Sequence, residues 1–246
     1  MADHDRWRLL MVDDTTGDDL AARLNEVARA LHRQGSAQDT LDEIVRSAVG
    51  TIPGAWHAGI MTIVSKRDIR TVATTDDVPR DVDQAQYDTG QGPCLTALYQ
   101  QKIVSAPDLA VESRWPLFAK RALALDVSSM LSFRLYVSGD DLGALNLYSP
   151  DTHAFDEESE HVGLLFAGHA AVALATAQER EHLADAVLTR DLIGQAKGIL
   201  MERHKLTADQ AFAVLVRASQ QTNAKLRDLA ERLTRTGELP PHAGLG

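Results

Sequence analysis

A stretch without proline runs from Phe155 to Arg203 and is rich in Ala, Leu, Glu and Arg. These residues favour helix, so the stretch predicts one or two long helices. Asp156 followed by Ser159 suits the start of such a helix. The preceding hundred or so residues instead alternate short β-prone runs with turn residues. The chain therefore joins a part that contains strands to a part that is helical.

The part before the long helix combines strands with short helices. Five of its runs favour β-strands: Trp56–Val64, Ile69–Thr74, Ile103–Ala106, Ser129–Val137 and Leu142–Tyr148. The polar turns Ser65–Asp68 and Gly139–Asp141 join two pairs of these runs into predicted hairpins. We expect an α+β domain whose antiparallel sheet has helices on one side and at its edges.

Helices are predicted before and between these strands. Residues 1–19 are polar and acidic and are expected to form a mobile tail. The apolar spacing over 20–50 predicts one or two amphipathic helices, broken around Gly35-Ser36. Pro93, after Gly90-Gln91-Gly92, suits the first turn of a short helix at Cys94–Tyr99. A further short helix is predicted at Trp115–Leu125.

The last fifty residues predict a bundle of three helices. The first ends near Arg203. Thr207 and Gln210 form a capping box for the second, at about Ala208–Gln220. Asn223 is expected to cap the third, which runs to about Arg235 and stops at Gly237. The expected core residues of the first and third helices are Leu192, Ile193, Ala196, Ile199, Leu200, Leu226, Leu229, Ala230 and Leu233.

Charge is distributed unevenly between the two parts. The chain has 25 Lys and Arg against 35 Asp and Glu, a net charge of −10. From Val187 to Leu239 nine basic residues stand against six acidic ones, a charge of +3, whereas the remainder has 16 basic and 29 acidic residues, −13. The total argues against a chain that coats nucleic acid by net charge, but the basic bundle can still bind it.

Location and redox chemistry are bounded by what the sequence lacks. No apolar run approaches the roughly 18 residues that cross a bilayer, and the N-terminus has no secretory pattern. We therefore expect a cytoplasmic protein with no membrane partner. The single cysteine, Cys94, excludes an internal disulfide and an all-cysteine metal site.

Cations in the bundle are spaced for phosphate contacts. Arg190 and Lys197 lie within about 20° of each other on a helix, with Gly194 between them. Further basic positions are Lys225 together with Arg232, Arg217 alone, and Arg203 together with Lys205. Phe212 is the bundle's one aromatic residue and is expected in the core, and the absence of Tyr and Trp argues against sequential base stacking.

These residues carry a family resemblance. They are Ile193-Gly194-Gln195-Ala196-Lys197-Gly198-Ile199-Leu200-Met201, then Thr207…Gln210-Ala211-Phe212…Leu215…Ala218-Ser219 and Asn223-Ala224-Lys225-Leu226…Leu229-Ala230. Together they resemble the ANTAR domain over Leu188–Leu239. The resemblance implies a three-helix module of transcription antiterminators that binds paired RNA hairpins in nascent transcripts, usually as a dimer. It implies RNA contacts by Gln195, Ala196, Lys197, Arg217, Ser219, Asn223 and Lys225. The angular position of Ala196 instead favours the core.

Four groups of residues mark the central region: Asp88…Gly90-Gln91-Gly92-Pro93-Cys94…Ala97-Leu98, Arg114-Trp115-Pro116…Phe118, Ser129-Met130-Leu131-Ser132-Phe133 and Leu142-Gly143-Ala144-Leu145-Asn146-Leu147-Tyr148-Ser149. With these residues the region resembles a GAF domain over about 37–180. It implies sensing of a small molecule, light or redox state, or dimerisation alone, and it identifies no cofactor. We expect a tail and leading helix at 1–36, the GAF domain at 37–178, a helical linker with the ANTAR domain at 179–239, and a tail at 240–246.

Catalysis is not expected. Cys94, near a helix N-terminus, suits a redox sensor or a chromophore attachment, but packing by a small side chain is the favoured interpretation. A GAF-type methionine sulfoxide reductase would need further cysteines. His57, His153, His161 and His169 lack metal-ligand spacing, so we expect no metal, and no phosphate loop or hydrolase motif occurs.

The sequence thus predicts a signal-responsive antiterminator that binds RNA hairpins. It is expected to be a homodimer, with an unidentified small-molecule ligand in the GAF domain. A seam for pairing is Val162, Phe166, His169, Ala173, Thr176, Arg180, Leu183 and Val187. The RNA candidates are Arg190, Gly194, Gln195, Ala196, Lys197, Arg203, Arg217, Ser219, Asn223 and Lys225. The alternatives are a DNA-binding regulator, a redox sensor or enzyme centred on Cys94, and a scaffold that only dimerises.

Overall fold

The computed structural model describes residues 14–65, 68–99, 102–137 and 140–239. It divides into two compact units, an N-terminal unit, Met1–Gln178, and a C-terminal unit, Glu179–Gly246. The expected tail at 240–246, most of the tail at 1–19 and Gly139 of the second hairpin turn lie outside the described residues. Helix α1, Asp14–His32, begins inside the stretch expected to be a tail.

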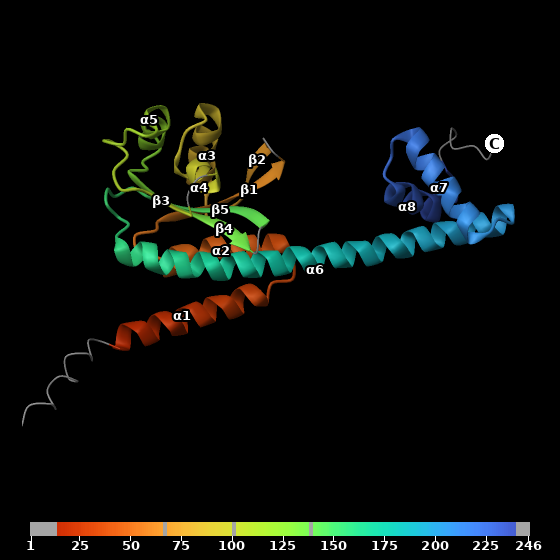
Figure 1. Cartoon of the computed structure of the whole chain (residues 1–246), viewed down its shortest axis with the longest axis horizontal. Helices are drawn as coiled ribbons and strands as arrows, with labels where there is room; N and C mark the ends of the chain where they lie inside the picture. Colours follow the sequence, from red (N-terminus) through yellow and green to blue (C-terminus); the bar gives the residue numbers. More distant parts are fainter. Residues whose placement is uncertain (1–13, 66–67, 100–101, 138–139, 240–246) are drawn as a thin grey trace, which may run out of the picture. The chain divides into compact units, whose positions relative to one another are not determined.

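The N-terminal unit is built on a five-stranded antiparallel sheet in the order β2-β1-β5-β4-β3 (Figure 1). The strands are β1 (His57–Ser65), β2 (Asp68–Thr74), β3 (Ile103–Ala106), β4 (Ser129–Val137) and β5 (Asp140–Ser149). All five lie where the sequence predicts them. Both predicted hairpins form, since β1 pairs with β2 and β4 pairs with β5.

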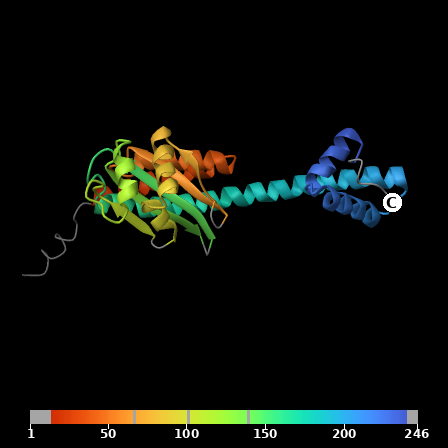
Figure 2. The same ribbon diagram turned by 90° about the horizontal axis from the view of Figure 1, so that it is seen from above.

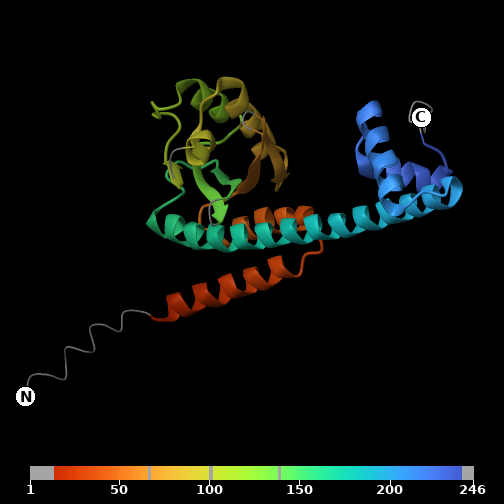
Figure 3. The same cartoon turned by 45° about the vertical axis from the view of Figure 1, so that its right-hand side comes forward.

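Helices cover both faces of this sheet, so the expected placement on one side and at the edges is wrong (Figures 1 and 3). On one face Ile60, Leu145 and Phe133 pack with α2 (Ala37–Thr51) and the first half of α6 (Glu157–His204). On the other, Met130 and Tyr148 pack beneath α3 (Asp77–Thr89) and α5 (Pro116–Leu123), with α4 (Pro93–Tyr99) on the same side. Neighbouring residues of a strand point to opposite faces, so these mostly apolar strands bury both faces.

Helix α3 was not predicted from the sequence. Its ends carry ordinary signals, because the Asp76 side chain accepts a hydrogen bond from Val78 N and Gly90 ends the helix at φ 64°. Its buried face, however, includes Asp83 and Gln86, both fully buried. Polar residues on the inward face hid the helical period of apolar residues.

Helix α6 is a single helix, and Asp156 Oδ1 accepts hydrogen bonds from both the amide and the hydroxyl of Ser159 at its start. Within the described residues it is also long and apolar enough to cross a membrane, by length and composition alone, and 44% of its most apolar window is buried. Phe166, Ala170 and Leu174 of that part pack into the core of the N-terminal unit. Packing on the sheet therefore accounts for much of the apolar character of α6.

The C-terminal unit combines the end of α6 with α7 (Ala208–Thr222) and α8 (Leu226–Thr236) (Figure 2). The predicted capping box is present, with Thr207 and Gln210 each accepting a backbone hydrogen bond from the other residue. Asn223 does not cap α8. It ends α7 in the left-handed conformation at φ 51°, and Lys225 stands at the N-cap of α8. The core of the unit consists mainly of Ala196, Leu200, Ala211, Leu215, Ala230 and Leu233.

Candidate nucleic-acid interface

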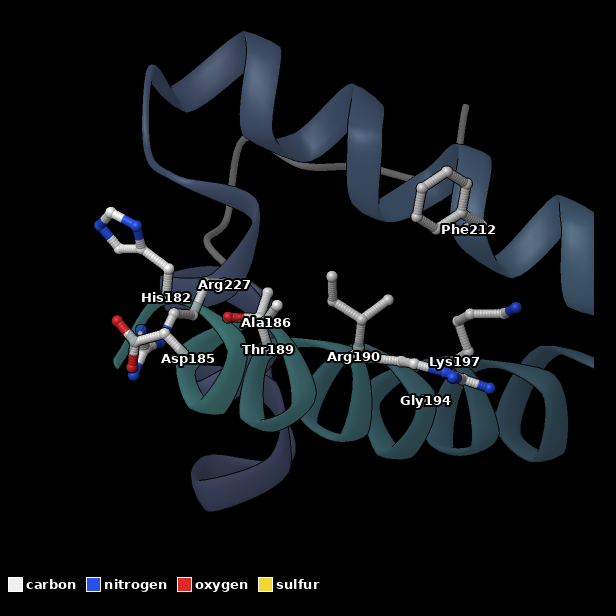
Figure 4. A pocket seen from close by; sticks show the side chains of 10 residues that line it. His182, Asp185, Ala186, Thr189, Arg190, Gly194, Lys197, Phe212 and Arg227 are labelled. Atoms are coloured by element: carbon white, nitrogen blue, oxygen red, sulfur yellow. Dashed lines mark ion pairs between the residues drawn. The ribbon is translucent and has the colours of Figure 1, made fainter. Parts of the chain in front are cut away.

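An open groove of about 730 Å³ lies within the C-terminal unit. Its lining includes Arg190, Gly194 and Lys197 from α6, Phe212 from α7 and Arg227 from α8. Figure 4 shows the three α6 residues along one stretch of that helix and Phe212 on α7 across from it. The structure thus brings three of the residues predicted to contact RNA into one groove, whose lining also includes Phe212 and Arg227, which were not predicted as contacts.

The spacing of Arg190, Gly194 and Lys197 places them on one side of α6, because positions i, i+4 and i+7 share a helix face. Apart from the adjoining residues and backbone of α6, a β-carbon added at Gly194 would meet no atom of the described residues within 4 Å. The helix surface is therefore low and open between the two cations. This arrangement leaves room for a polymer backbone between two positive charges.

The groove is positively charged. Among the described residues, neither Arg190 nor Lys197 forms an ion pair with a carboxylate, so both charges are available to a ligand. At another part of the groove Arg227 Nη1 lies 3.4 Å from Asp185 Oδ1, which links α8 to α6. Cations free of carboxylates suit phosphate oxygens.

Phe212 is not in the core, contrary to the prediction. It is 41% exposed, and Lys197 Nζ lies 5.9 Å from the centre of its ring. The buried residues of α7 are Ala211, Leu215 and Ala218, spaced four and three apart. Phe212 is rotated about 100° from Ala211 and so lies beside the buried stripe. That spacing is the sequence signal that would have identified it.

Ala196 is the one predicted RNA contact whose side chain is fully buried. It packs in the core of the three helices, as its angular position indicated, and its methyl group cannot touch RNA in this fold. Gln195 is exposed but does not line the groove, and Arg217 and Lys225 are also exposed. Lys225 lies two residues before Arg227, which does line the groove.

Three other predicted contacts make hydrogen bonds or caps inside the unit. Arg203 Nη1 donates to the carbonyl of Gly237, where α8 ends. Ser219 Oγ donates to the carbonyl of Ala224 at 2.7 Å, and Asn223 forms the left-handed end of α7. These residues stabilise the ends and the turn of the bundle. That structural role accounts for polar residues at these positions whether or not they contact RNA.

Cys94 of the N-terminal unit is fully buried among Met61, Leu98 and Ala144. Burial in apolar surroundings disfavours the reactive thiolate and keeps oxidants away. The position of Cys94 therefore fits the packing interpretation better than the redox one.

A buried carboxyl lies on the same side of the sheet. Asp83 of α3 is fully buried and accepts hydrogen bonds from the Tyr148 hydroxyl at 2.5 Å and the Thr71 hydroxyl at 2.8 Å. Desolvation raises the pKa of Asp83 to about 7, although these hydrogen bonds oppose the rise. Close by, the buried atoms Ser132 Oγ and Asn146 Oδ1 have no hydrogen-bond partner within the part of the chain that the structure describes. Nothing in the sequence pattern indicated this polar cluster.

Two observations on the described residues bear on the histidines and on metal binding. His57 Nδ1 lies 2.6 Å from Asp76 Oδ2, the N-cap of α3, so it pairs two neighbouring elements. The described residues contain no group of three or more His, Cys, Asp or Glu side chains placed to hold a metal ion.

Comparison with known proteins identifies both units. A model of the GAF domain matches residues 34–175, and a model of the ANTAR domain matches residues 181–233. No curated protein matches the chain.

Solved structures resemble the N-terminal unit in fold. The GAF domain of a phosphoenolpyruvate-protein phosphotransferase from Coxiella burnetii is 17% identical, with a TM-score of 0.53 over 66% of this chain and 96% of that one. The phycoerythrobilin-bound GAF domain of a cyanobacterial phytochrome is 13% identical, with a TM-score of 0.52 over 66% and 98%. Free methionine-R-sulfoxide reductase from Neisseria meningitidis is 13% identical, with a TM-score of 0.51 over 65% and 91%.

GAF and ANTAR domains are regulatory or sensory domains, and the ANTAR domain implies RNA binding. The chain belongs to the GAF domain family, and its GAF domain is followed by an ANTAR domain, the architecture of signal-regulated, RNA-binding antitermination proteins.

Proposed function

We propose that the C-terminal unit binds RNA hairpins in nascent transcripts and thereby prevents a terminator from forming. The observation that carries this proposal is the groove in which Arg190 and Lys197 flank the open surface at Gly194, where neither cation has a carboxylate partner among the described residues. Two such cations provide the phosphate contacts that anchor RNA, and the +3 charge of the surrounding sequence favours its approach.

We further propose that the domains have the bounds expected from the sequence, with the GAF domain at 37–178 and the linker and ANTAR domain at 179–239. The GAF domain receives the signal, and two chains pair to place two RNA-binding surfaces. A signal can change how the two chains pair only if it binds one arrangement of the pair more tightly than another. The exposed side chains of Leu183 and Val187 on α6 support pairing through that helix.

RNA contact is tested by removing two of the predicted cations, the half-buried Lys197 of the groove and the exposed Lys225. The Lys197→Ala, Lys225→Ala double variant should bind a hairpin that overlaps a terminator more weakly than the wild type. It should also show a log–log salt dependence that is shallower by about two, because each phosphate contact contributes a slope of about one.

The control removes equal charge from the same unit. Lys205 Nζ is paired with Glu202 at 2.7 Å, and Arg235 is exposed in the last turn of α8. The Lys205→Ala, Arg235→Ala variant should bind nearly as the wild type does. If both double variants bind the hairpin as tightly as the wild type does at low salt, Lys197 and Lys225 do not contact RNA.

A further inference from the structure

Phe212 is exposed although the helical core is complete without it. The ring is 41% exposed on α7, whereas the buried residues of the same helix are Ala211, Leu215 and Ala218. A large apolar ring left in water forgoes the stabilisation that burial would bring. The ring lines a groove, so a molecule bound in that groove would contact it.

A cation accompanies the ring. Lys197 Nζ lies 5.9 Å from the ring centre, and Arg190 lines the same groove (Figure 4). An aromatic face beside cations is the combination with which proteins bind single-stranded nucleic acid, because the ring stacks on a base and the cations contact the phosphates. The charge of the groove thus matches the backbone and its ring matches a base.

The available space fits a nucleotide. A volume of about 730 Å³ falls within the roughly 300–1,000 Å³ of pockets that hold small molecules, enough for a base with its sugar and phosphate. Gly194 leaves the α6 side of the groove open, since a β-carbon there would meet nothing within 4 Å. From Glu179 to Gly246 the sequence contains no other Phe, Tyr or Trp, so the groove offers one stacking surface.

We propose that this groove receives one unpaired nucleobase from the loop of the bound hairpin, stacked on Phe212, with the adjoining phosphates held by Lys197 and Arg190. The inference rests on the proposed RNA binding and adds the part of the RNA that is recognised. An unpaired base is required because both faces of a base inside a stem are covered by its neighbours, whereas a loop base can be turned outward.

The test uses the full chain and RNA hairpins that share one stem, closed by loops of random sequence. Phe212→Leu retains an apolar side chain and has at least equal helix propensity, but it lacks the aromatic face. It should weaken binding of the hairpins selected by the wild type about 5- to 150-fold, the range for one base stacked on one aromatic ring. Phe212→Tyr keeps the face and should bind as the wild type does.

The RNA provides the matched half of the experiment. An abasic nucleotide at one loop position should weaken binding by the wild type as much as Phe212→Leu does, and the two changes should not add. With 2-aminopurine at that position, the wild type and Phe212→Tyr should change the probe's fluorescence alike, and Phe212→Leu should not. These readouts follow stacking, which a purely structural role of the ring would not affect.

The outcomes separate this inference from the function on which it rests. If the wild type prefers hairpins to a blunt duplex of the same stem but Phe212→Leu binds equally well, the stacking inference is wrong and hairpin binding stands. If the wild type does not prefer hairpins, both are wrong. If the loss of binding caused by Phe212→Leu adds to the loss caused by an abasic nucleotide at every loop position, the ring does not stack on a loop base.

Discussion

Asp83 shows at the scale of one residue how the N-terminal unit can respond to pH. Burial raises the pKa of its carboxyl from 3.8 to about 7, so the folded unit holds a proton that the unfolded chain releases at lower pH. The stabilisation is therefore complete below the unfolded pKa and is lost as the pH rises through about 7. Above that pH the fold buries a charge.

The Asp83→Asn variant isolates this effect because its side chain stays neutral. Between about pH 5 and about pH 8 the free energy of unfolding of the wild type should fall relative to that of the variant, by at most a few kcal/mol at about 1.4 kcal/mol for each pKa unit. Tryptophan fluorescence during urea unfolding is the suitable readout, since all three Trp precede residue 179. Parallel pH profiles for the two proteins would show that Asp83 is not protonated in the fold.

Helix α6 raises a question at the scale of one element, because it has glycine at both 194 and 198 in its interior. Each glycine costs a helix about 1 kcal/mol relative to alanine, and a β-carbon at either position would meet nothing within 4 Å. Packing therefore does not require glycine at either place. Of the two, Gly194 lines the groove.

These glycines form a matched pair of tests. Gly194→Ala and Gly198→Ala should each stabilise the helix by up to about 1 kcal/mol in thermal melts followed by circular dichroism. Gly194→Ala should also weaken hairpin binding, because its methyl group occupies the space that the RNA backbone approaches, whereas Gly198→Ala should not. Unchanged binding by both variants would mean that RNA does not approach α6 at Gly194.

A helix or strand could be predicted from the sequence where its buried residues are apolar and repeat at the spacing of that element. The strands and α8 could be placed from sequence, because Leu229, Ala230 and Leu233 repeat at helical spacing and the strands are apolar between turn residues. Helix α3 could not, since Asp83 and Gln86 on its buried face are polar.

The site was predictable where its residues share one helix. Arg190, Gly194 and Lys197 follow from the period of α6. The facing ring of Phe212 and the pairing of Arg227 with Asp185 depend on how α7 and α8 pack on α6, which sequence periodicity does not specify.

Pairing of two chains concerns the whole molecule, and the structure narrows the predicted seam. Val162 and Phe166 are buried in the core of the N-terminal unit, so they cannot contact a second chain. Leu183 and Val187 are about 60% exposed one turn apart on α6. Together with Gly194 they lie within about 40° of one another around the helix, so the proposed pairing surface runs toward the RNA groove.

The Leu183→Glu, Val187→Glu variant should reduce the fraction of dimer in sedimentation experiments, because it places like charges where two apolar side chains would meet. It should also weaken binding to RNA that carries two hairpins more than binding to one hairpin, since pairing supplies the second site. Leu117→Glu, which changes an exposed leucine of α5, is the control. A variant that dimerises as the wild type does would place the pairing surface elsewhere.

RNA binding by the C-terminal unit is the central proposal for the whole molecule. The most direct measurement is a competition in which the intact protein, bound to a labelled RNA hairpin that overlaps a terminator, is challenged at fixed salt with unlabelled hairpin or with duplex DNA of the same stem sequence. The hairpin should displace the label at a far lower concentration than the duplex does, because the proposed site takes an unpaired loop base as well as phosphates. Displacement by duplex DNA at an equal or lower concentration would contradict it and would indicate a DNA-binding regulator.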